Sequence, residues 1–350
     1  MHFTKTLLTW YAENKRDFEW RSSKDPYRIW LSEIILQQTR TAQGAPYYTR
    51  FIKAFPNVQA LAEASEDKVL KLWQGLGYYS RARNLHATAQ RIAEEYQGVF
   101  PASFNALLDL KGVGDYTASA IASICFGLPE AVVDGNVFRF LSRYFGIDTP
   151  IHSAGAQKEF KERATQLMDV SDPGTFNQAL MEFGALVCSP KAPRCSLCPF
   201  QKSCFAFLHE AQFDYPVKAK KTKVKKRFFN YLILEDQNQS VAFHQRVNKG
   251  IWYKLFEFPL IETDQDLTTY SQLSKQPELV VQFKNLPKKA ILWNKEPLIH
   301  KLSHQTLCIR FWVFPKISNL QQGVFIKDIQ DYPVPLVLQN FIRDYFKFDA

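Results

Sequence analysis

Four cysteines crowd into one short stretch of this sequence, and no other feature limits the possible fold as strongly. They follow the spacing Cys188-x6-Cys195-x2-Cys198-x5-Cys204. Four thiolates this close along the chain can hold a metal centre within one loop. Structural zinc is the alternative, but zinc ribbons usually carry two short-spaced cysteine pairs and this stretch has one. The spacing therefore predicts a [4Fe–4S] cluster on these four residues.

The charge balance favours a polyanionic partner. The formal net charge is +10 and the pI is about 9.2, and every Lys or Arg near a phosphate releases a counterion. Charge alone leaves a merely soluble basic protein equally open.

No apolar run approaches the roughly 18 residues of a membrane span, and the first residues do not resemble a signal peptide. We therefore expect a cytoplasmic protein, nucleoid-associated if bacterial, with metal-bound rather than disulfide-bonded cysteines. Cys125 and Cys308 lie apart from the cluster loop, and we expect them to be ordinary buried thiols.

The patterning divides the 350 residues into two parts. Residues 1–208 have helical spacing of apolar residues, whereas 228–350 carry short apolar and aromatic runs typical of an α+β domain. Between them, 209–227 is expected to be an extended basic connector, because seven of the ten residues in 218–227 are Lys or Arg. A solvated linker and a phosphate-contacting segment are equally open for this connector. Helices are expected from Pro26 through Gln37 and at 59–73, 82–96, 103–109, 116–126, 136–145, 156–169, 175–187 and 334–347. Strands are expected at 228–234, 240–245, 279–283 and 307–314.

A Gly-x-Gly turn between two expected helices is the second motif. It contains Lys111, Gly112 and Gly114 and leads into a helix rich in small residues. Glycines let the backbone approach a phosphate closely, and the new helix aims its free N–H groups at that phosphate. The turn predicts a helix-hairpin-helix contact to a phosphate, although plain turns share the pattern.

An aspartate follows this turn by twenty residues. Asp134 stands between an apolar stretch and an expected helix. A carboxylate there is partly desolvated but stays ionised beside the helix N-terminus. An ordinary N-cap is the simpler interpretation of this residue taken alone.

Taken together, the hairpin, Asp134 and the cysteine pattern resemble the helix-hairpin-helix, Gly/Pro-Asp superfamily of DNA glycosylases. Within it, several segments resemble the MutY family of adenine DNA glycosylases, and the resemblance covers almost the whole chain. These segments are WLSEIILQQT (30–39), GLGYYSRARNLH (75–86), VVDGNVFR (132–139) and FNQALMEFGALVC (176–188).

This resemblance implies a role for each matching residue. Glu33 matches the family's general acid at adenine N7, and Asp134 matches the carboxylate that stabilises the sugar cation. Asn136 orients that carboxylate, and Tyr116 lies beside the scissile sugar. Three more residues match the adenine pocket: Trp20, Arg21 and Gln178. Two match the groups that are inserted into the duplex beside 8-oxoguanine: Gln38 and Tyr78.

The same resemblance implies the architecture. We expect an all-α helix-hairpin-helix glycosylase domain with a [4Fe–4S] loop over 1–208, followed by an α+β Nudix-like lesion-recognition domain over 228–350. The first domain is expected to comprise a six-helix barrel (about 22–130) and a cluster domain (1–21 plus 131–208). In the second, Ser303 and His304 match the family's 8-oxoguanine-recognising Phe-Ser-His element. Leu302 replaces the Phe, and no Nudix metal box is visible.

The implied activity is monofunctional hydrolysis of the N-glycosidic bond of a flipped adenine paired with 8-oxoguanine or guanine. We expect double-stranded DNA as partner and a monomer that does not bind membranes. An endonuclease III-like glycosylase/lyase is the first alternative, but Tyr116 replaces the lysine that such enzymes use. A catalytically silent lesion binder would need neither Glu33 nor Asp134, and a stand-alone Nudix hydrolase lacks its metal box.

Overall fold

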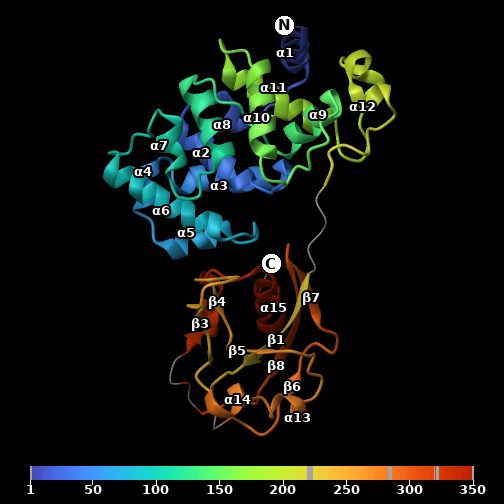
Figure 1. Cartoon of the computed structure of the whole chain (residues 1–350). Coiled ribbons are helices and arrows are strands. Elements are labelled where there is room, and N and C mark those ends of the chain that lie inside the picture. Colours follow the sequence, from blue (N-terminus) through green and yellow to red (C-terminus); the bar gives the residue numbers. More distant parts are fainter. Residues whose placement is uncertain (1, 219–223, 283–285, 319, 321–322, 349–350) are drawn as a thin grey trace. The chain divides into compact units, whose positions relative to one another are not determined.

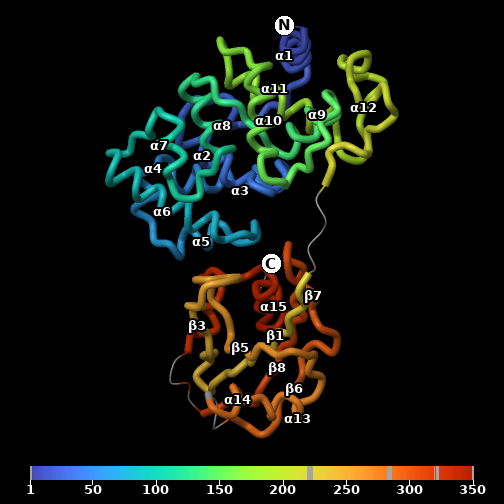
Figure 2. Tube along the Cα trace, in the orientation of Figure 1, coloured from blue at the N-terminus to red at the C-terminus, as the bar shows by residue number. Residues whose placement is uncertain are grey.

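A computed structural model describes residues 2–218, 224–282, 286–318, 320 and 323–348. The chain divides into two compact units, one formed by Met1–Ala64 with Ser80–Lys220 and the other by Ser65–Tyr79 with Lys221–Ala350. Figures 1 and 2 trace both units by residue number. Within the described ranges, no helix is long and apolar enough to cross a membrane.

The described residues of the first unit form helices joined by loops (Figure 1). Its expected helices at 82–96, 103–109, 116–126, 136–145, 156–169 and 175–187 are confirmed to within two residues at each end. The elements are α1 (His2–Asn14), η1 (Glu19–Ser22), α2 (Pro26–Leu36), α3 (Thr41–Ala54), α4 (Val58–Ala62), α6 (Ser80–Glu95), α7 (Phe104–Leu108), α8 (Asp115–Phe126), α9 (Gly135–Phe145), α10 (Ala156–Leu167), α11 (Pro173–Leu186), η2 (Cys195–Leu197), η3 (Gln201–Ser203) and α12 (Phe205–Leu208).

Aromatic packing ties the start of the chain to the cysteine loop. Phe3 of α1 lies 4.9 Å from Phe200, and Phe140 of α9 lies 4.5 Å from Phe183 of α11, measured between ring centroids. All four belong to one buried cluster of α1, α9, α10, α11 and the loop. Burial of such rings stabilises a core strongly, so this cluster fixes the cysteine loop on α9 and α11.

The second unit combines one helix from the segment Ser65–Tyr79 with a C-terminal α+β fold. Its elements are α5 (Glu66–Trp73), β1 (Lys225–Ile233), β2 (Ser240–Val241), β3 (His244–Gln245), β4 (Phe256–Glu257), β5 (Leu260–Thr263), α13 (Tyr270–Leu273), α14 (Pro277–Gln282), β6 (Ile291–Leu292), β7 (Leu298–Lys301), β8 (Gln305–Val313), β9 (Val324–Phe325), η4 (Ile326–Asp331) and α15 (Leu336–Phe346).

The main sheet has the order β5-β1-β8-β6, and β7 also pairs with β8. The central strands β1 and β8 are parallel, with Phe228 opposite Cys308. Helix α15 covers one face, where the rings of Phe341 and Phe311 stack at 3.7 Å. Trp312 of β8 belongs to the apolar cluster that also includes residues of α13 and α14. The expected α+β domain is therefore confirmed.

Three expected elements differ from the structure. The strand expected at 279–283 is wrong, because Pro277–Gln282 is helical: Leu279 is buried, while Val280 and Val281 are 57% and 68% exposed. One strand was expected at 240–245, but β2 and β3 pair with different partners, β9 and β4. The single helix expected at 59–73 is two helices, because Ser65 caps α5 by accepting a hydrogen bond from Lys68 N.

The end of the expected basic connector overlaps the first strand of the second unit. Residues 219–223 lie outside the described ranges, and β1 already begins at Lys225. Arg227, within the basic run, forms an ion pair with Glu262, with 2.6 Å between Nη2 and Oε2. This arginine therefore has a structural partner in the sheet.

Candidate active site

Helix α2 places Glu33 in a buried position. Asp25 caps the helix by accepting a hydrogen bond from Tyr27 N, and Pro26 occupies the first turn as expected. Residues on most sides of α2 are buried, and Glu33 itself is only 9% exposed. A carboxylate so deep in a helical core needs partners or a proton.

Tyr116 from the first turn of α8 supplies the partner. Its hydroxyl donates a hydrogen bond to Oε2 of Glu33 at 2.6 Å, and it also lies 3.4 Å from the sulfur of Met181. Burial raises the pKa of Glu33 to about 7; the hydrogen bond from Tyr116 opposes this rise, the charge of Asp134 adds to it, and Arg21 opposes it. A carboxyl with this pKa is about half protonated at neutral pH.

Asp134 is both an N-cap and a candidate functional carboxylate. One oxygen, Oδ1, accepts hydrogen bonds from Asn136 N at 2.9 Å and from Val137 N at 2.8 Å, which begins α9. The other oxygen accepts from Nδ2 of Asn136 at 2.6 Å. Burial raises the pKa of Asp134, while the hydrogen bonds from Val137 and Asn136 and the charge of Arg139 oppose the rise. Every direct donor therefore favours the ionised form.

A short chain of hydrogen bonds leads from Asn136 to the cysteine loop. Nη2 of Arg139 donates to Oδ1 of Asn136 at 2.9 Å, and Nε of the same residue donates to the carbonyl of Cys188 at 2.7 Å. Nη2 also donates to the carbonyl of Gly184 at 2.6 Å. A Cβ at Gly184 would lie 2.6 Å from the carbonyl oxygen of Asn136, so only glycine allows α11 to approach α9 this closely.

The expected adenine-pocket residues Trp20 and Arg21 lie at a pair of stacked aromatic rings near the start of the chain. Phe18 and Trp20 stack with their ring centroids 4.9 Å apart, and the guanidinium of Arg21 lies 4.8 Å from the Phe18 ring. On α11, the side-chain oxygen of Gln178 accepts a hydrogen bond from the hydroxyl of Tyr11 at 2.9 Å. Trp20 and Arg21 thus lie side by side on η1, while Gln178 is held by α1.

Two charged residues of this group were not identified from the sequence. Glu182 is 1% exposed and forms ion pairs with Arg16 and Arg21 at 2.7 and 2.8 Å. The sequence contains a signal for Glu182, because it lies one helical turn after Gln178 on α11 and so shares a face with it. Arg16 has no comparable signal, since only the fold brings it to α11.

The Gly-x-Gly turn joins α7 to α8 as expected. Gly112 has φ +80°, and a Cβ there would lie 2.7 Å from Cβ of Asn84, so glycine is required. Gly114 is the N-cap of α8, and the space around its Cα is open within 4 Å. Lys111, Gly112 and Gly114 are exposed. An open backbone before a helix N-terminus suits a phosphate.

Gln38 and Tyr78 share an uncommon backbone conformation. Their φ angles are +55° and +48°, in the left-handed region that residues other than glycine rarely adopt. Both side chains are exposed. Such strain persists only where the surroundings enforce it and is concentrated at functional positions.

The second unit brings Tyr78 to the turn between β7 and β8. The hydroxyl of Tyr78 forms a short hydrogen bond with the hydroxyl of Ser303. Ser303 and His304 are exposed, and the turn is closed by a hydrogen bond from Leu302 N to Gln305 O at 2.8 Å. The resemblance implies that Tyr78 and Ser303 both act at 8-oxoguanine. The two residues lie far apart in the sequence but are in contact in the structure.

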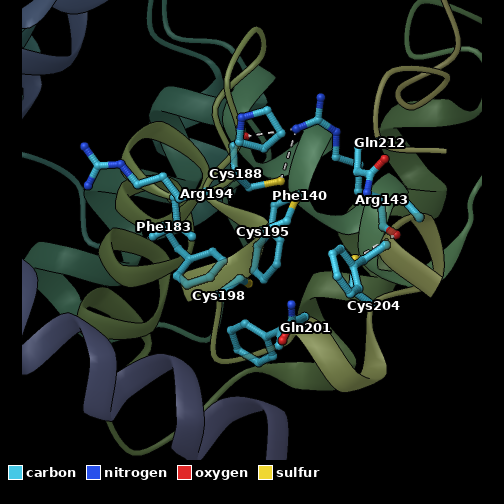
Figure 3. A pocket seen from close by; sticks show the side chains of 15 residues that line it. Phe140, Arg143, Phe183, Cys188, Arg194, Cys195, Cys198, Gln201, Cys204 and Gln212 are labelled. Atoms are coloured by element: carbon cyan, nitrogen blue, oxygen red, sulfur yellow. Dashed lines mark hydrogen bonds between the residues drawn. The ribbon is translucent and has the colours of Figure 1, made fainter. Parts of the chain in front are cut away.

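The cysteine loop forms its own pocket. The four cysteines of the motif line it together with Phe140, Phe183 and Phe200 (Figure 3). Nη1 of Arg143 lies 3.4 Å from the sulfur of Cys188. Four soft sulfur donors in an apolar pocket, with the arginines Arg143 and Arg194 in its lining, fit the expected cluster. Among the described residues, no group of three or more Cys, His, Asp or Glu side chains is close enough together to hold a metal ion. Cys308 is buried, and Cys125 is partly buried.

Known proteins share both units. A family model described as "HhH-GPD superfamily base excision DNA repair protein" matches residues 31–166, and one described as "NUDIX domain" matches 230–344. The adenine DNA glycosylase of Buchnera aphidicola subsp. Baizongia pistaciae is 36% identical over 318 residues, which cover 89% of this chain and 86% of that protein. The adenine DNA glycosylase of Homo sapiens is 45% identical over 213 residues, 58% of this chain and 39% of that protein.

Solved structures show the same helical fold. A thermostable thymine-DNA glycosylase is similar with a TM-score of 0.56 and 32% identity, over 59% of this chain and 96% of that one. The protein in a non-covalent endonuclease III–DNA complex is similar with a TM-score of 0.53 and 18% identity, over 60% of this chain and 95% of that one.

Proposed function

The chain belongs to the adenine DNA glycosylases of base excision repair, and on this basis we propose that it hydrolyses the N-glycosidic bond of a flipped adenine paired with 8-oxoguanine or guanine. As a DNA N-glycosylase it needs an acid for the base and an anion for the sugar. The proposal rests above all on one observation: Glu33 is buried, bonded to Tyr116 and within electrostatic reach of Asp134.

Glu33 is the proposed general acid. Adenine is a poor leaving group until a ring nitrogen is protonated, so the acid must hold a proton near neutral pH. Burial gives Glu33 this property by raising its pKa to about 7. The hydroxyl of Tyr116 occupies one lone pair of Oε2 and thereby fixes the carboxyl group for proton delivery to the base.

Asp134 is the proposed stabiliser of the sugar cation. Departure of the base leaves positive charge on the sugar, and an ionised carboxylate beside it lowers the barrier. The hydrogen bonds from Asn136 hold Asp134 in place and favour its ionised form. Asn136 is therefore the proposed orienting residue.

The base and the duplex have proposed contacts of their own. Trp20, Arg21 and Gln178 would contact the flipped adenine, since a base needs an apolar face and a few polar groups at its edge. Gln38 and Tyr78, both held at positive φ, would occupy the space that the base leaves. The exposed turn of Lys111, Gly112 and Gly114 would bind a DNA phosphate, and Ser303 with His304 would bind the edge of 8-oxoguanine. We expect the enzyme to act on double-stranded DNA as a monomer.

Tyr116 argues for hydrolysis without strand cleavage. A lyase forms a Schiff base through an amine, and a phenol has none. At the position beside Glu33 this chain carries the tyrosine hydroxyl. The endonuclease III-like alternative is therefore disfavoured.

We also propose that Cys188, Cys195, Cys198 and Cys204 hold a [4Fe–4S] cluster. Such a cluster, when bound, supplies a rigid covalent link among the four thiolates of the loop. Protein purified anaerobically should contain about four irons per chain, by the stoichiometry of the cluster. Cys198→Ser should lose most of this iron, whereas the control Cys125→Ser, outside the loop, should retain it. Zinc without iron in the unmodified protein would exclude the cluster.

A glycosylase assay tests the main proposal. Duplexes with A opposite 8-oxoguanine, G or C would be incubated in single turnover, with and without alkali afterwards. We expect base loss that becomes a strand break only after alkali, fastest opposite 8-oxoguanine. Strand breaks without alkali, or equal rates on all three duplexes, would contradict the proposal.

A further inference from the structure

Glu182 is the most deeply buried carboxylate of the first unit's described residues that has no role so far. Its side chain is 1% exposed. Oε1 accepts hydrogen bonds from the backbone N and from Nε of Arg16, at 3.0 and 2.7 Å. Oε2 accepts from Nη2 of Arg16 and Nη2 of Arg21, both at 2.8 Å. One carboxylate thus joins two guanidinium groups.

Both arginines lie on the aromatic surface that flanks the proposed adenine pocket. The guanidinium carbons of Arg16 and Arg21 lie 5.0 and 4.8 Å from the Phe18 ring, which stacks on Trp20. Arg21 also donates a hydrogen bond from Nη1 to the carbonyl of Arg16 at 2.9 Å. The carboxylate of Glu182 therefore fixes where these two cations stand. Without it, the two like charges would repel each other.

The charge of Glu182 is constant at any working pH. Burial alone would raise its pKa, but hydrogen bonds from Arg16 and Arg21 outweigh burial and bring the pKa to about 2. Arg16 and Arg21 therefore always share one full negative charge. Two cations that share an anion act on a third group more weakly than two uncompensated cations do.

The third group is Glu33. Helices α3, α6 and α8 and the short helix η1 pack against α2. From α3, Tyr48 lies within electrostatic reach of Arg28 and Asp25 at the start of α2. From η1, Arg21 favours the ionised form of Glu33; from α8, Tyr116 donates a hydrogen bond; and Asp134, at the N-cap of α9, favours the protonated form. Further groups are Cys125 on α8, which is in electrostatic contact with Glu33, and Arg81 on α6, which donates to the carbonyls of Ile34, Ile35 and Gln37.

We propose that Glu182 is a positioning residue for base removal: it fixes Arg16 and Arg21 beside the adenine pocket, and it offsets part of their positive charge so that Glu33 keeps the proton that it delivers. The proposal rests on the role of Glu33 as general acid. It also explains how a pocket can carry two arginines next to an acid that must stay protonated. Cations normally favour the ionised form of such a carboxyl.

The pH profile of the single-turnover rate tests this proposal in the full-length protein. In Glu182→Gln, Arg21 loses its counter-charge and Glu33 ionises more readily. The alkaline limb of the profile, where the rate falls because Glu33 loses its proton, should move to lower pH. The shift should be on the order of one pH unit for an unscreened charge inside a protein. In Arg21→Gln the cation is gone, so the limb should move to higher pH. The double variant Glu182→Gln with Arg21→Gln should return the limb close to its original position.

The matched control is Glu95→Gln. It breaks an ion pair with Arg91 on α6 of the same unit, with 2.8 Å between Nε and Oε2, whereas the charges that act on Glu33 are those of Asp134 and Arg21. Its alkaline limb should not move. A merely structural role of Glu182 would lower the rate equally at all pH values, and such parallel profiles would refute the proposal.

Two further measurements keep the outcomes distinct. An unchanged rate in Glu33→Gln would contradict the role of Glu33 as general acid, on which the proposal rests. If Glu33→Gln is inactive but the alkaline limb of the Glu182→Gln profile does not move, only the role of Glu182 is refuted. Circular-dichroism melting would show whether Glu182→Gln folds. If it does not, Arg21→Gln decides the question, because an unmoved limb in that variant excludes any influence of Arg21 on Glu33.

Discussion

Replacing Glu33 with Gln separates the catalytic value of its proton from the structural cost of its burial. The pKa of this carboxyl is raised by burial from 4.5 to about 7. Each pKa unit corresponds to about 1.4 kcal/mol, so ionising Glu33 in the folded protein costs about 3 kcal/mol more than in the unfolded chain. At pH 7 about half of the molecules hold the proton, whereas an ordinary carboxyl would hold it in fewer than about 1%.

The sign of the stability effect follows from proton binding. Between pH 4.5 and about 7 the folded protein binds this proton and the unfolded chain does not, so the stability of the unmodified protein falls as the pH rises through this window. Above pH 7 the loss reaches its full value of about 3 kcal/mol. Gln has no charge to bury, and its amide oxygen still accepts the hydrogen bond from Tyr116. Glu33→Gln should therefore be the more stable protein at pH 8, with the gap closing towards pH 5.

Two assays measure these effects. Single-turnover base removal from A opposite 8-oxoguanine should fall by about 10²–10⁴-fold, the usual contribution of a general acid. Urea unfolding at pH 5 and pH 8 should show the stability gap only at the higher pH. Glu159→Gln is the matched control, because Glu159 is an exposed residue in the first turn of α10. An active Glu33→Gln, or a stability gap that is the same at both pH values, would refute the reasoning.

Three further changes test the remaining roles. Asp134→Asn should fold, because Asn is an equally good N-cap, but base removal should fall at least about a hundredfold while DNA binding in a gel-shift assay persists. Tyr116→Lys should allow borohydride to trap a covalent DNA adduct that the unmodified protein does not form; no adduct would show that position 116 lies away from the sugar. Ser303→Ala with His304→Ala should lower the preference for 8-oxoguanine over guanine by about tenfold to a hundredfold, with an unchanged salt dependence of binding. An unchanged preference would show that other residues distinguish the lesion.

Local signals predicted the helical unit well and the sheet less well. A period of 3.6 residues, with Pro26 in the first turn of α2, is written into adjacent residues, so α2 and several of its neighbours could be located from the sequence. The cap at Ser65 was overlooked, and α4 and α5 were therefore expected as one helix. The helix α14 was missed because two valines follow Leu279, and a short run of β-branched residues also suits a strand. The short strands β2 and β3 depend on pairing partners far along the chain, which no local pattern contains.

The candidate site shows the same division. Glu33, Tyr116 and Asp134 were expected together only because the whole sequence resembles one family, since each residue alone has an ordinary structural explanation. Arg16 and Glu182 are 166 positions apart, and their contact exists only because α1, η1 and α11 meet in the fold. The conformations of Gln38 and Tyr78 could not be predicted either, because neither is a residue type that favours positive φ.

Asp134 shows why structural and catalytic explanations need not compete. The same donors, Asn136 N and Val137 N, begin α9 and hold the carboxylate in its ionised form. The N-terminus of α9 thus both positions the Asp134 carboxylate and keeps it ionised, as stabilisation of the sugar cation requires. Arg139 extends this arrangement by bonding Asn136 and the carbonyl of Cys188 at once. The end of α11, where the cysteine loop begins, therefore helps to fix the orientation of Asn136 and, through it, of Asp134.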